Sequence, residues 1–369
     1  MATTSTATTG RTSFEEEIFQ QIKAGIMKEA GAAAPKKEEP PVVIKKAERK
    51  AEAGQVMYSK LIGKVPPKME DFPVSVLSSK DVPSEVKAFI PSETDPELVG
   101  YVPQLEQLYQ LILAMEDGDK VVISGPTGSG KTSMVKYACM KTGRPFMRIN
   151  GNGDIESSAI FGQLVVEGGG TVWRDGVATE ATKYGGVLCV DEWEVLPPEI
   201  TMGFQAVLES GGTLFLKEKP GTSEDKLVVP HKQARYVFCG NTVGQGDDSG
   251  AFAGTTVQNT ATIDRFDTSI YLGYLQPSHE EAILTNKIAD LDKSVAKLMI
   301  QYASLVRTAY MQSNIGLTMS PRTLINWGRK IVRYGKVKTA LEYSYLNKLR
   351  DSDKKIATEM LTKVFGKIE

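Results

Sequence analysis

Residues 120–133 read KVVISGPTGSGKTS, and the expected fold follows from this stretch. The β-branched residues near its start predict a short buried strand. Gly125 to Thr132 then fits the pattern G-x-x-x-x-G-K-[ST], in the strand–loop–helix context that the pattern requires. Because glycines let backbone N–H groups curl around an anion at the N-terminus of a helix, the loop predicts a phosphate-binding site.

The same loop predicts the ligands. Lys131 is expected to place its charge on the β- and γ-phosphate oxygens, and the Thr132 hydroxyl is expected to bind Mg²⁺. ATP and Mg²⁺ are therefore the expected cofactors, and the rival interpretation is a glycine-rich turn with a chance lysine. The residues predicted to bind them are Gly125, Pro126, Thr127, Gly128, Ser129, Gly130, Lys131, Thr132 and Ser133.

Strands and helices alternate on both sides of the loop. Helical spacing at 102–118 and 133–143 and strand-like runs at 145–150, 185–192 and 234–241 predict an α/β fold, a parallel sheet with helices on both faces. After residue 273 only helical spacing remains, which predicts an all-helical lid. The expected domains are a disordered tail and linker (1–54), an extended segment packing on the core (55–95), the nucleotide-binding domain (96–272) and the helical lid domain (273–369).

Composition excludes several other classes. The net charge of −1 gives no overall field that would attract nucleic acid, so a general nucleic-acid binder is not expected. Cys139, Cys189 and Cys239 stand singly in apolar runs and predict buried reduced thiols. With only two histidines, a zinc site is not expected. Since no apolar stretch reaches 18 residues and the start lacks a signal pattern, we expect a cytoplasmic protein without a membrane partner.

An acidic pair ends the third expected strand. Asp191 and Glu192 follow the apolar run from Val187 to Val190, at the edge where a parallel sheet binds its ligand. Asp191 is the predicted second metal ligand, acting through water. Glu192 is the predicted catalytic base that polarises the attacking water. A polar strand exit without function is the alternative.

The next strand ends at Asn241, and a long polar loop leads from it to Arg265. An amide both donates and accepts, so Asn241 can orient water and contact phosphate together. Arg265 is badly placed to serve its own site and is expected to reach the nucleotide of a neighbouring subunit as an arginine finger. The alternative for Arg265 is a surface ion pair with Asp264 or Asp267.

One more arginine stands at a helix start in the expected lid. Ser320 and Pro321 mark the start, and Arg322 falls in the first turn, where the helix dipole disfavours a cation. Arg322 is therefore a catalytic candidate that would fold onto the γ-phosphate when the lid closes. A solvated arginine is the alternative.

Taken together, these motifs resemble the AAA+ class. GNTVGQGDDSGAFAGTTVQN (240–259), DRF (264–266), WRDG (173–176) and MSPRTLINW (319–327) are similar to the ATPase subunits of aerobic cobaltochelatases, within the MoxR-like branch. The resemblance covers about residues 85–345. It implies a homo-hexameric ring that hydrolyses ATP at subunit interfaces and acts with a partner bearing a von Willebrand factor A domain.

The resemblance does not specify the substrate on which the ring acts. Remodelling of a partner protein, or metal insertion, is the first hypothesis. A true cobaltochelatase subunit is the second, and a nucleic-acid motor is the third. Two segments, 161–176 and 211–231, predict hairpins that in related motors project near the central pore. The alternative is that the two hairpins have no function. Acidic residues among the lysines of the second hairpin disfavour binding of a nucleic acid along it.

Overall fold

The computed structural model describes residues 50–246 and 257–366. The predicted tail, most of the predicted linker and the middle of the loop between Asn241 and Arg265 lie outside the described residues.

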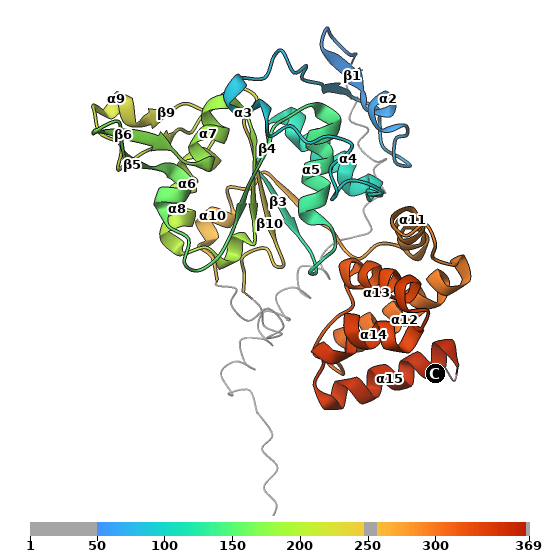
Figure 1. The fold of residues 1–369 in the computed structure, drawn as a ribbon. Helices are drawn as coiled ribbons and strands as arrows, with labels where there is room; N and C mark the ends of the chain where they lie inside the picture. The colour runs from blue at the N-terminus through green and yellow to red at the C-terminus, as the bar shows by residue number, and fades with distance from the viewer. Residues whose placement is uncertain (1–49, 247–256, 367–369) are drawn as a thin grey trace, which may run out of the picture. The chain divides into compact units, whose positions relative to one another are not determined.

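The core is a five-stranded parallel sheet (Figure 1). The strand order is β11-β3-β10-β7-β4, and all four neighbouring pairs run parallel. The strands are β3 (Val121–Ser124), β4 (Phe146–Asn150), β7 (Val187–Asp191), β10 (Arg235–Gly240) and β11 (Thr268–Tyr271). The α/β prediction is thus confirmed. Sequence reasoning missed β11, because only Ile270 of its four residues is buried and the apolar signal is weak.

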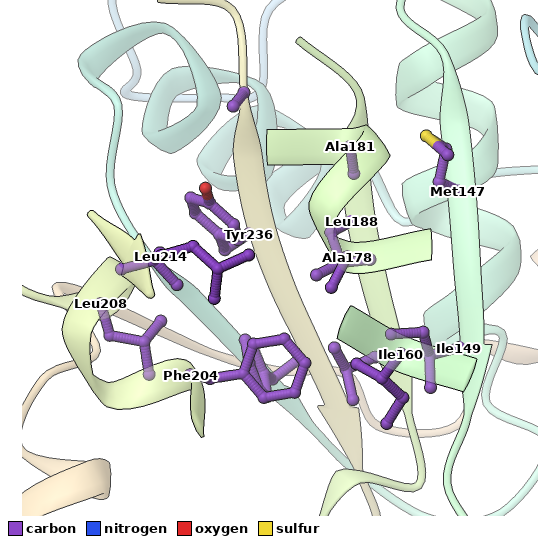
Figure 2. Packing of buried hydrophobic residues seen from close by; sticks show 14 of the residues in the cluster. Met147, Ile149, Ile160, Ala178, Ala181, Leu188, Phe204, Leu208, Leu214 and Tyr236 are labelled. Carbon is purple, nitrogen blue, oxygen red and sulfur yellow. The ribbon is translucent and has the colours of Figure 1, made fainter. Parts of the chain in front are cut away.

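Alternate residues of the central strands face opposite sides of the sheet. On one side Leu188 and Tyr236 pack beneath α6 (Ser157–Phe161), α7 (Val177–Tyr184) and α8 (Pro198–Leu208), as Figure 2 shows. On the other side Val187 and Val237 pack against α4 (Leu105–Asp117) and α5 (Lys131–Thr142). Two apolar layers therefore hold the sheet between helices, as expected for parallel strands.

A short segment precedes this core. β1 (Gln55–Met57) pairs antiparallel with β2 (Pro73–Ser75), and α2 (Tyr58–Ile62) lies between them in the chain. The ring of Tyr58 stacks on Phe72 and meets Tyr109 of α4 edge-on, with ring centroids 5.1–5.3 Å apart. Such aromatic contacts bind the segment to the core. One further helix, α3 (Ser84–Lys87), follows.

Both predicted hairpins are present. β5 (Gly162–Glu167) pairs with β6 (Gly170–Asp175), and β8 (Leu214–Phe215) pairs with β9 (Leu227–Val228). At the first turn Gly168 and Gly169 have positive φ values of 60° and 80°, a conformation that favours glycine. The second hairpin carries the short helix α9 (Ser223–Lys226) in its connection, and its strands pair at Leu214–Val228 and Phe215–Leu227.

The last part of the chain is helical. The helices are α11 (Pro277–Lys287), α12 (Lys293–Met311), α13 (Pro321–Tyr334), α14 (Val337–Ser344) and α15 (Asp351–Phe365), with a 3-10 turn η2 (Leu346–Lys348). Their apolar core includes Met299, Tyr302 and Trp327. The sequence predicted only helices after residue 273, and the structure confirms this.

The sequence predicts buried, reduced cysteines and no membrane-spanning segment. Cys139, Cys189 and Cys239 are all buried free thiols, as predicted. Among the described residues, no helix is long and apolar enough to cross a membrane.

The helical core depends on Trp327. Its side chain is fully buried, its ring meets Tyr302 at 5.3 Å, and its Nε1–H donates to the Val337 carbonyl at 3.1 Å. We expect Trp327→Ala to lower the free energy of unfolding by about 3–5 kcal/mol, as for a large buried aromatic. Trp327→Phe keeps the ring contact and should lose less. Urea unfolding followed by circular dichroism measures both, and equal stability of Trp327→Ala and wild type would contradict this packing.

Candidate nucleotide-binding site

A cavity of about 610 Å³ opens where β7 and β10 end. Its walls come from the phosphate loop (residues 125–132), from these strand ends, and from α11 and α13 of the helical part. Thr127 to Ser133, Asp191, Glu192, Asn241 and Arg322 all line it. The structure therefore gathers most of the sequence-predicted site residues around one cavity; Gly125 and Pro126 lie just behind it in the loop.

The loop has the backbone shape that its glycines predict. Gly128 and Gly130 have φ values of 76° and 94°, in the left-handed region. A Cβ on Gly125 would lie 2.1 Å from the Leu272 carbonyl oxygen, so the loop approaches the chain after β11 too closely for any side chain. Gly130 is also the N-cap of α5, which directs the first N–H groups of that helix into the loop.

Lys131 lies inside the loop. Its Nζ donates to the carbonyls of Gly125 (2.8 Å) and Pro126 (3.2 Å) and to Oδ1 of Asn241 (3.2 Å). Burial lowers the pKa of Lys131, and the nearby Cys239 and Asp191 act in the opposite direction. Among the described residues, the hydrogen-bond acceptors of this buried ammonium are neutral oxygens, so an anionic phosphate would stabilise its charge.

Thr132 and Asp191 meet as the metal prediction requires. The Thr132 hydroxyl donates to Oδ2 of Asp191 at 2.8 Å. Hydroxyl and carboxylate oxygens are the hard ligands that Mg²⁺ prefers. The buried Ser129 hydroxyl has no hydrogen-bond partner among the described residues, which fits a loop shaped for an acceptor-rich group. The residues present therefore fit Mg²⁺ and a polyphosphate.

Glu192 follows Asp191 with its side chain exposed into the cavity. Its backbone is left-handed, with φ 53° and ψ 40°, an uncommon conformation for a non-glycine residue. Such local strain is typical of functional positions. Gly151 makes this possible, because a Cβ there would lie 2.4 Å from the Glu192 carbonyl oxygen.

Asn241 lies beside Lys131, and a buried acid holds it there. The backbone N–H groups of Asn241 and Thr242 both donate to Oε1 of Glu194, the second at 3.0 Å. A Cβ on Gly240 would lie 2.1 Å from Oε2 of Glu194, so the contact requires glycine at the strand end. Burial raises the pKa of Glu194, while these backbone donors lower it. Sequence reasoning missed Glu194; its position two residues after Glu192 is the available signal.

Arg265 does not line the cavity. It follows the short helix α10 (Thr260–Ile263), and its guanidinium pairs with Glu209 at the end of α8, at 2.8 Å. Asp267 pairs instead with Lys120, at 3.6 Å. Arg265 thus forms an ion pair, as the alternative interpretation expected, but its partner is Glu209 and not Asp264 or Asp267. The side chain remains about a quarter exposed.

Arg322 reaches the cavity from α13. Ser320 caps this helix by accepting the Thr323 N–H at 3.2 Å, and Pro321 is its first residue, as predicted. A Cβ on Gly128 would lie 2.6 Å from the Cβ of Ser320, so the helix start lies against the phosphate loop. Arg322 has no hydrogen bond or ion pair to the residues that the structure describes.

A buried ion pair supports this helix start. Arg307 of α12 makes a bidentate pair with Glu280 of α11, at 2.7 and 3.0 Å, and both side chains are buried. Its Nε also donates to the Met319 carbonyl at 2.8 Å, and its guanidinium lies over the Tyr274 ring at 4.4 Å. Arg307 therefore ties the residues before α13 to two other helical elements and to the strand-to-helix connection.

Other residues at the cavity were not predicted. Arg148 of β4 pairs with Asp191, and Lys287, Arg329 and Tyr101 also line the walls. Arg148 could have been found from the sequence, because it is a charged residue two positions before a strand end, between buried Met147 and Ile149. The others depend on how the helical part packs.

Comparison with known proteins agrees with this geometry. Residues 120–266 match the AAA domain of the dynein-related subfamily, and residues 280–367 match the CbbQ/NirQ/NorQ C-terminal domain. This chain belongs to the MoxR-like AAA+ ATPases. The resemblance seen in the sequence is thereby confirmed.

Two curated proteins and one solved structure are similar to this chain. The aerobic cobaltochelatase subunit CobS of a Sinorhizobium species is 28% identical over 291 residues, which cover 77% of this chain and 85% of that protein. Protein CbbQ of Hydrogenophilus thermoluteolus is 26% identical over 215 residues, 58% of this chain and 74% of that one. The RuvB Holliday junction branch migration motor of Thermotoga maritima aligns with a TM-score of 0.40 at 15% identity, over 73% of each chain.

Glu194 gives a test of how Asn241 is held in this AAA+ site. Glu194→Ala would leave two half-buried N–H groups without this acceptor, so we expect a loss of about 2 kcal/mol in the free energy of unfolding. Glu194→Gln keeps an acceptor and should lose less. Glu199→Ala, an exposed acid on α8, is the control. Urea unfolding and amide hydrogen exchange at residues 240–242 are the measurements. Unchanged protection in Glu194→Ala would contradict the contact.

Proposed function

We propose that this AAA+ protein binds Mg-ATP in the cavity and hydrolyses it to ADP and phosphate. The observation that carries the proposal is the convergence of Lys131, Thr132, Asp191 and Asn241 through hydrogen bonds of 2.8–3.2 Å, with Glu192 exposed beside them. These are the groups that phosphoryl transfer requires for binding, charge neutralisation and activation of water.

The roles follow from the positions. Lys131 and the N–H groups of the phosphate loop bind the phosphate oxygens. Thr132 and Asp191 would hold Mg²⁺, which when bound supplies positive charge against the phosphates. Glu192 takes a proton from the attacking water. The Asn241 amide, fixed beside Lys131, orients that water and contacts the phosphate.

The arginines of the same chain that line this site are Arg148, Arg322 and Arg329, and Arg265 is not among them. Arg265 lies outside the cavity, about a quarter exposed and paired with Glu209 at the end of α8. We therefore propose a ring of identical subunits, expected to be hexameric, in which Arg265 completes the neighbouring site. Arg322, unpaired among the described residues, would contact the γ-phosphate when the helical lid closes.

The proposed work of the ring is remodelling of a partner protein in the cytoplasm, where ATP is available. Both hairpins expose apolar side chains: Val166 is 83% exposed, Phe215 51% and Val229 72%. Exposed apolar side chains suit a protein surface better than a phosphate backbone. A partner with a von Willebrand factor A domain is the expected kind. A pull-down with a variant that binds but does not hydrolyse ATP would identify it.

A second candidate function is that of the ATPase subunit of a cobaltochelatase, acting through partner subunits in metal insertion. The match to CobS over 85% of that protein favours it. Among the described residues no cluster of three or more His, Cys, Asp or Glu could hold a metal ion, so the metal would be handled by the partner. Recovery of a large chelatase subunit in the pull-down would support this candidate.

The first prediction from the proposal concerns Glu192. Glu192→Gln should keep binding of Mg-ATP and lose turnover by about a hundredfold or more, because it removes the base without disturbing the phosphate loop. Phosphate release measures turnover, and binding of a fluorescent ATP analogue measures affinity. Glu218→Gln, an exposed acid of the second hairpin, is the control. Turnover near the wild-type rate in Glu192→Gln would refute the assignment.

The second prediction concerns Arg265 in trans. An Arg265→Ala subunit keeps an intact cavity, and a Lys131→Ala subunit keeps an intact arginine. Each alone should be inactive, and mixed rings should regain turnover, because the arginine of one variant serves the cavity of the other. The effect of such a finger is on the order of 10³ or more, so partial recovery should be clear.

A control separates the finger from the ion pair. Glu209→Gln removes the partner of Arg265 and leaves the arginine, so it should keep turnover if Arg265 acts on another subunit. Exchange of subunits is verified first by mixing differently tagged proteins. With exchange verified, a mixture no more active than its parents, or a Glu209→Gln variant as inactive as Arg265→Ala, would overturn the trans role.

A further inference from the structure

Arg148 makes a contact that the proposed reaction does not use. Its Nη2 lies 2.5 Å from Oδ2 of Asp191 and 3.1 Å from Oδ1 of Asn150. The arginine side chain is 40% exposed, whereas that of Asp191 is 11% exposed. Arg148 therefore lies at the open side of the site, and Asp191 at its floor.

The position of Arg148 follows from the sheet. Buried Met147 and Ile149 fix one face of β4 against the core, so Arg148 must lie on the other face. β4 is one of the two edge strands and, among the described strands, pairs only with β7, with Arg148 opposite Cys189 and Asn150 opposite Asp191. The guanidinium thus reaches the end of the neighbouring strand from a rigid base.

The Asp191 oxygen that Arg148 contacts also accepts a second hydrogen bond. Oδ2 of Asp191 also accepts the Thr132 hydroxyl at 2.8 Å. Thr132 and Asp191 are the two residues proposed to hold Mg²⁺. A guanidinium and a divalent cation at the same carboxylate repel each other over a few ångströms, and the ion pair already neutralises much of the charge that attracts the metal. The two cations are therefore competitors for Asp191.

We propose that Arg148 is a positioning residue that sets the Mg²⁺ requirement of nucleotide binding by competing with the metal for Asp191. The proposal rests on the proposed function, since it takes Mg-ATP as the ligand of the cavity. In the unloaded site Arg148 neutralises Asp191 and keeps it oriented toward Thr132. Loading of the metal requires Arg148 to leave Oδ2, which its exposure permits.

The experiment is a Mg²⁺ titration of the full-length protein with a fluorescent ATP analogue held at a fixed concentration below that of the protein, and binding is followed by anisotropy. Arg148→Gln should lower the Mg²⁺ concentration at half-maximal binding by about three- to fivefold, the scale of a partly exposed ion pair. Arg148→Lys keeps the charge without the planar fork and should fall between Arg148→Gln and wild type. Arg174→Gln removes an exposed arginine that pairs with Glu167 and does not line the cavity, and it should leave the midpoint unchanged.

Every outcome decides the inference. An unchanged midpoint in Arg148→Gln overturns it, and a raised midpoint also does so, because Arg148 would then help to hold the loaded nucleotide. Thermal unfolding of each variant establishes that it is folded; if Arg148→Gln is not, Arg148→Lys carries the test alone. Wild-type protein that binds no nucleotide at any Mg²⁺ concentration refutes the proposed function itself, which is distinct from failure of this inference.

Discussion

The parallel pairing of β3, β10 and β7 is the constraint on which the site depends. Parallel strands all end at the same edge, and the register aligns Cys239 with Asp191 and Gly240 with Ser124. The residues just beyond these positions are the phosphate loop, Glu192 and Asn241. Lys131 and Asn241, which are 110 residues apart in the chain, are therefore brought together by the pairing of the strands. The helices on the two faces keep the sheet rigid and so keep these groups in place.

A second layer of contacts joins the strand ends to one another. Glu194 holds the backbone of Asn241, while Trp193 packs edge-on against Phe238 at 5.9 Å and Phe266 at 5.5 Å. Trp193 follows Glu192 in the chain, and Phe266 follows Arg265. The base proposed for one site and the arginine proposed for its neighbour thus flank a single buried aromatic cluster.

The helical part contributes through a comparable buried network. Arg307 joins Glu280, Tyr274 and the carbonyl of Met319, immediately before the cap of α13. A buried ion pair adds little net stability, but loss of one partner leaves an uncompensated charge, so the arrangement is well defined. This buried network fixes the start of α13 against the phosphate loop and places Arg322 at the cavity.

The sequence by itself determined the phosphate loop, the strand and helix alternation, the acidic pair and the strand-terminal Asn241. These are local patterns, because a glycine-rich turn, an apolar run or a capping serine acts within a few residues. It missed β11, which is buried at one position only. Only the tertiary structure showed that Glu194 holds Asn241, that Arg265 pairs with Glu209 and that Arg148 contacts Asp191. Each of these contacts joins different elements, and the side-chain partner is decided by strand register and helix packing, which no local pattern encodes.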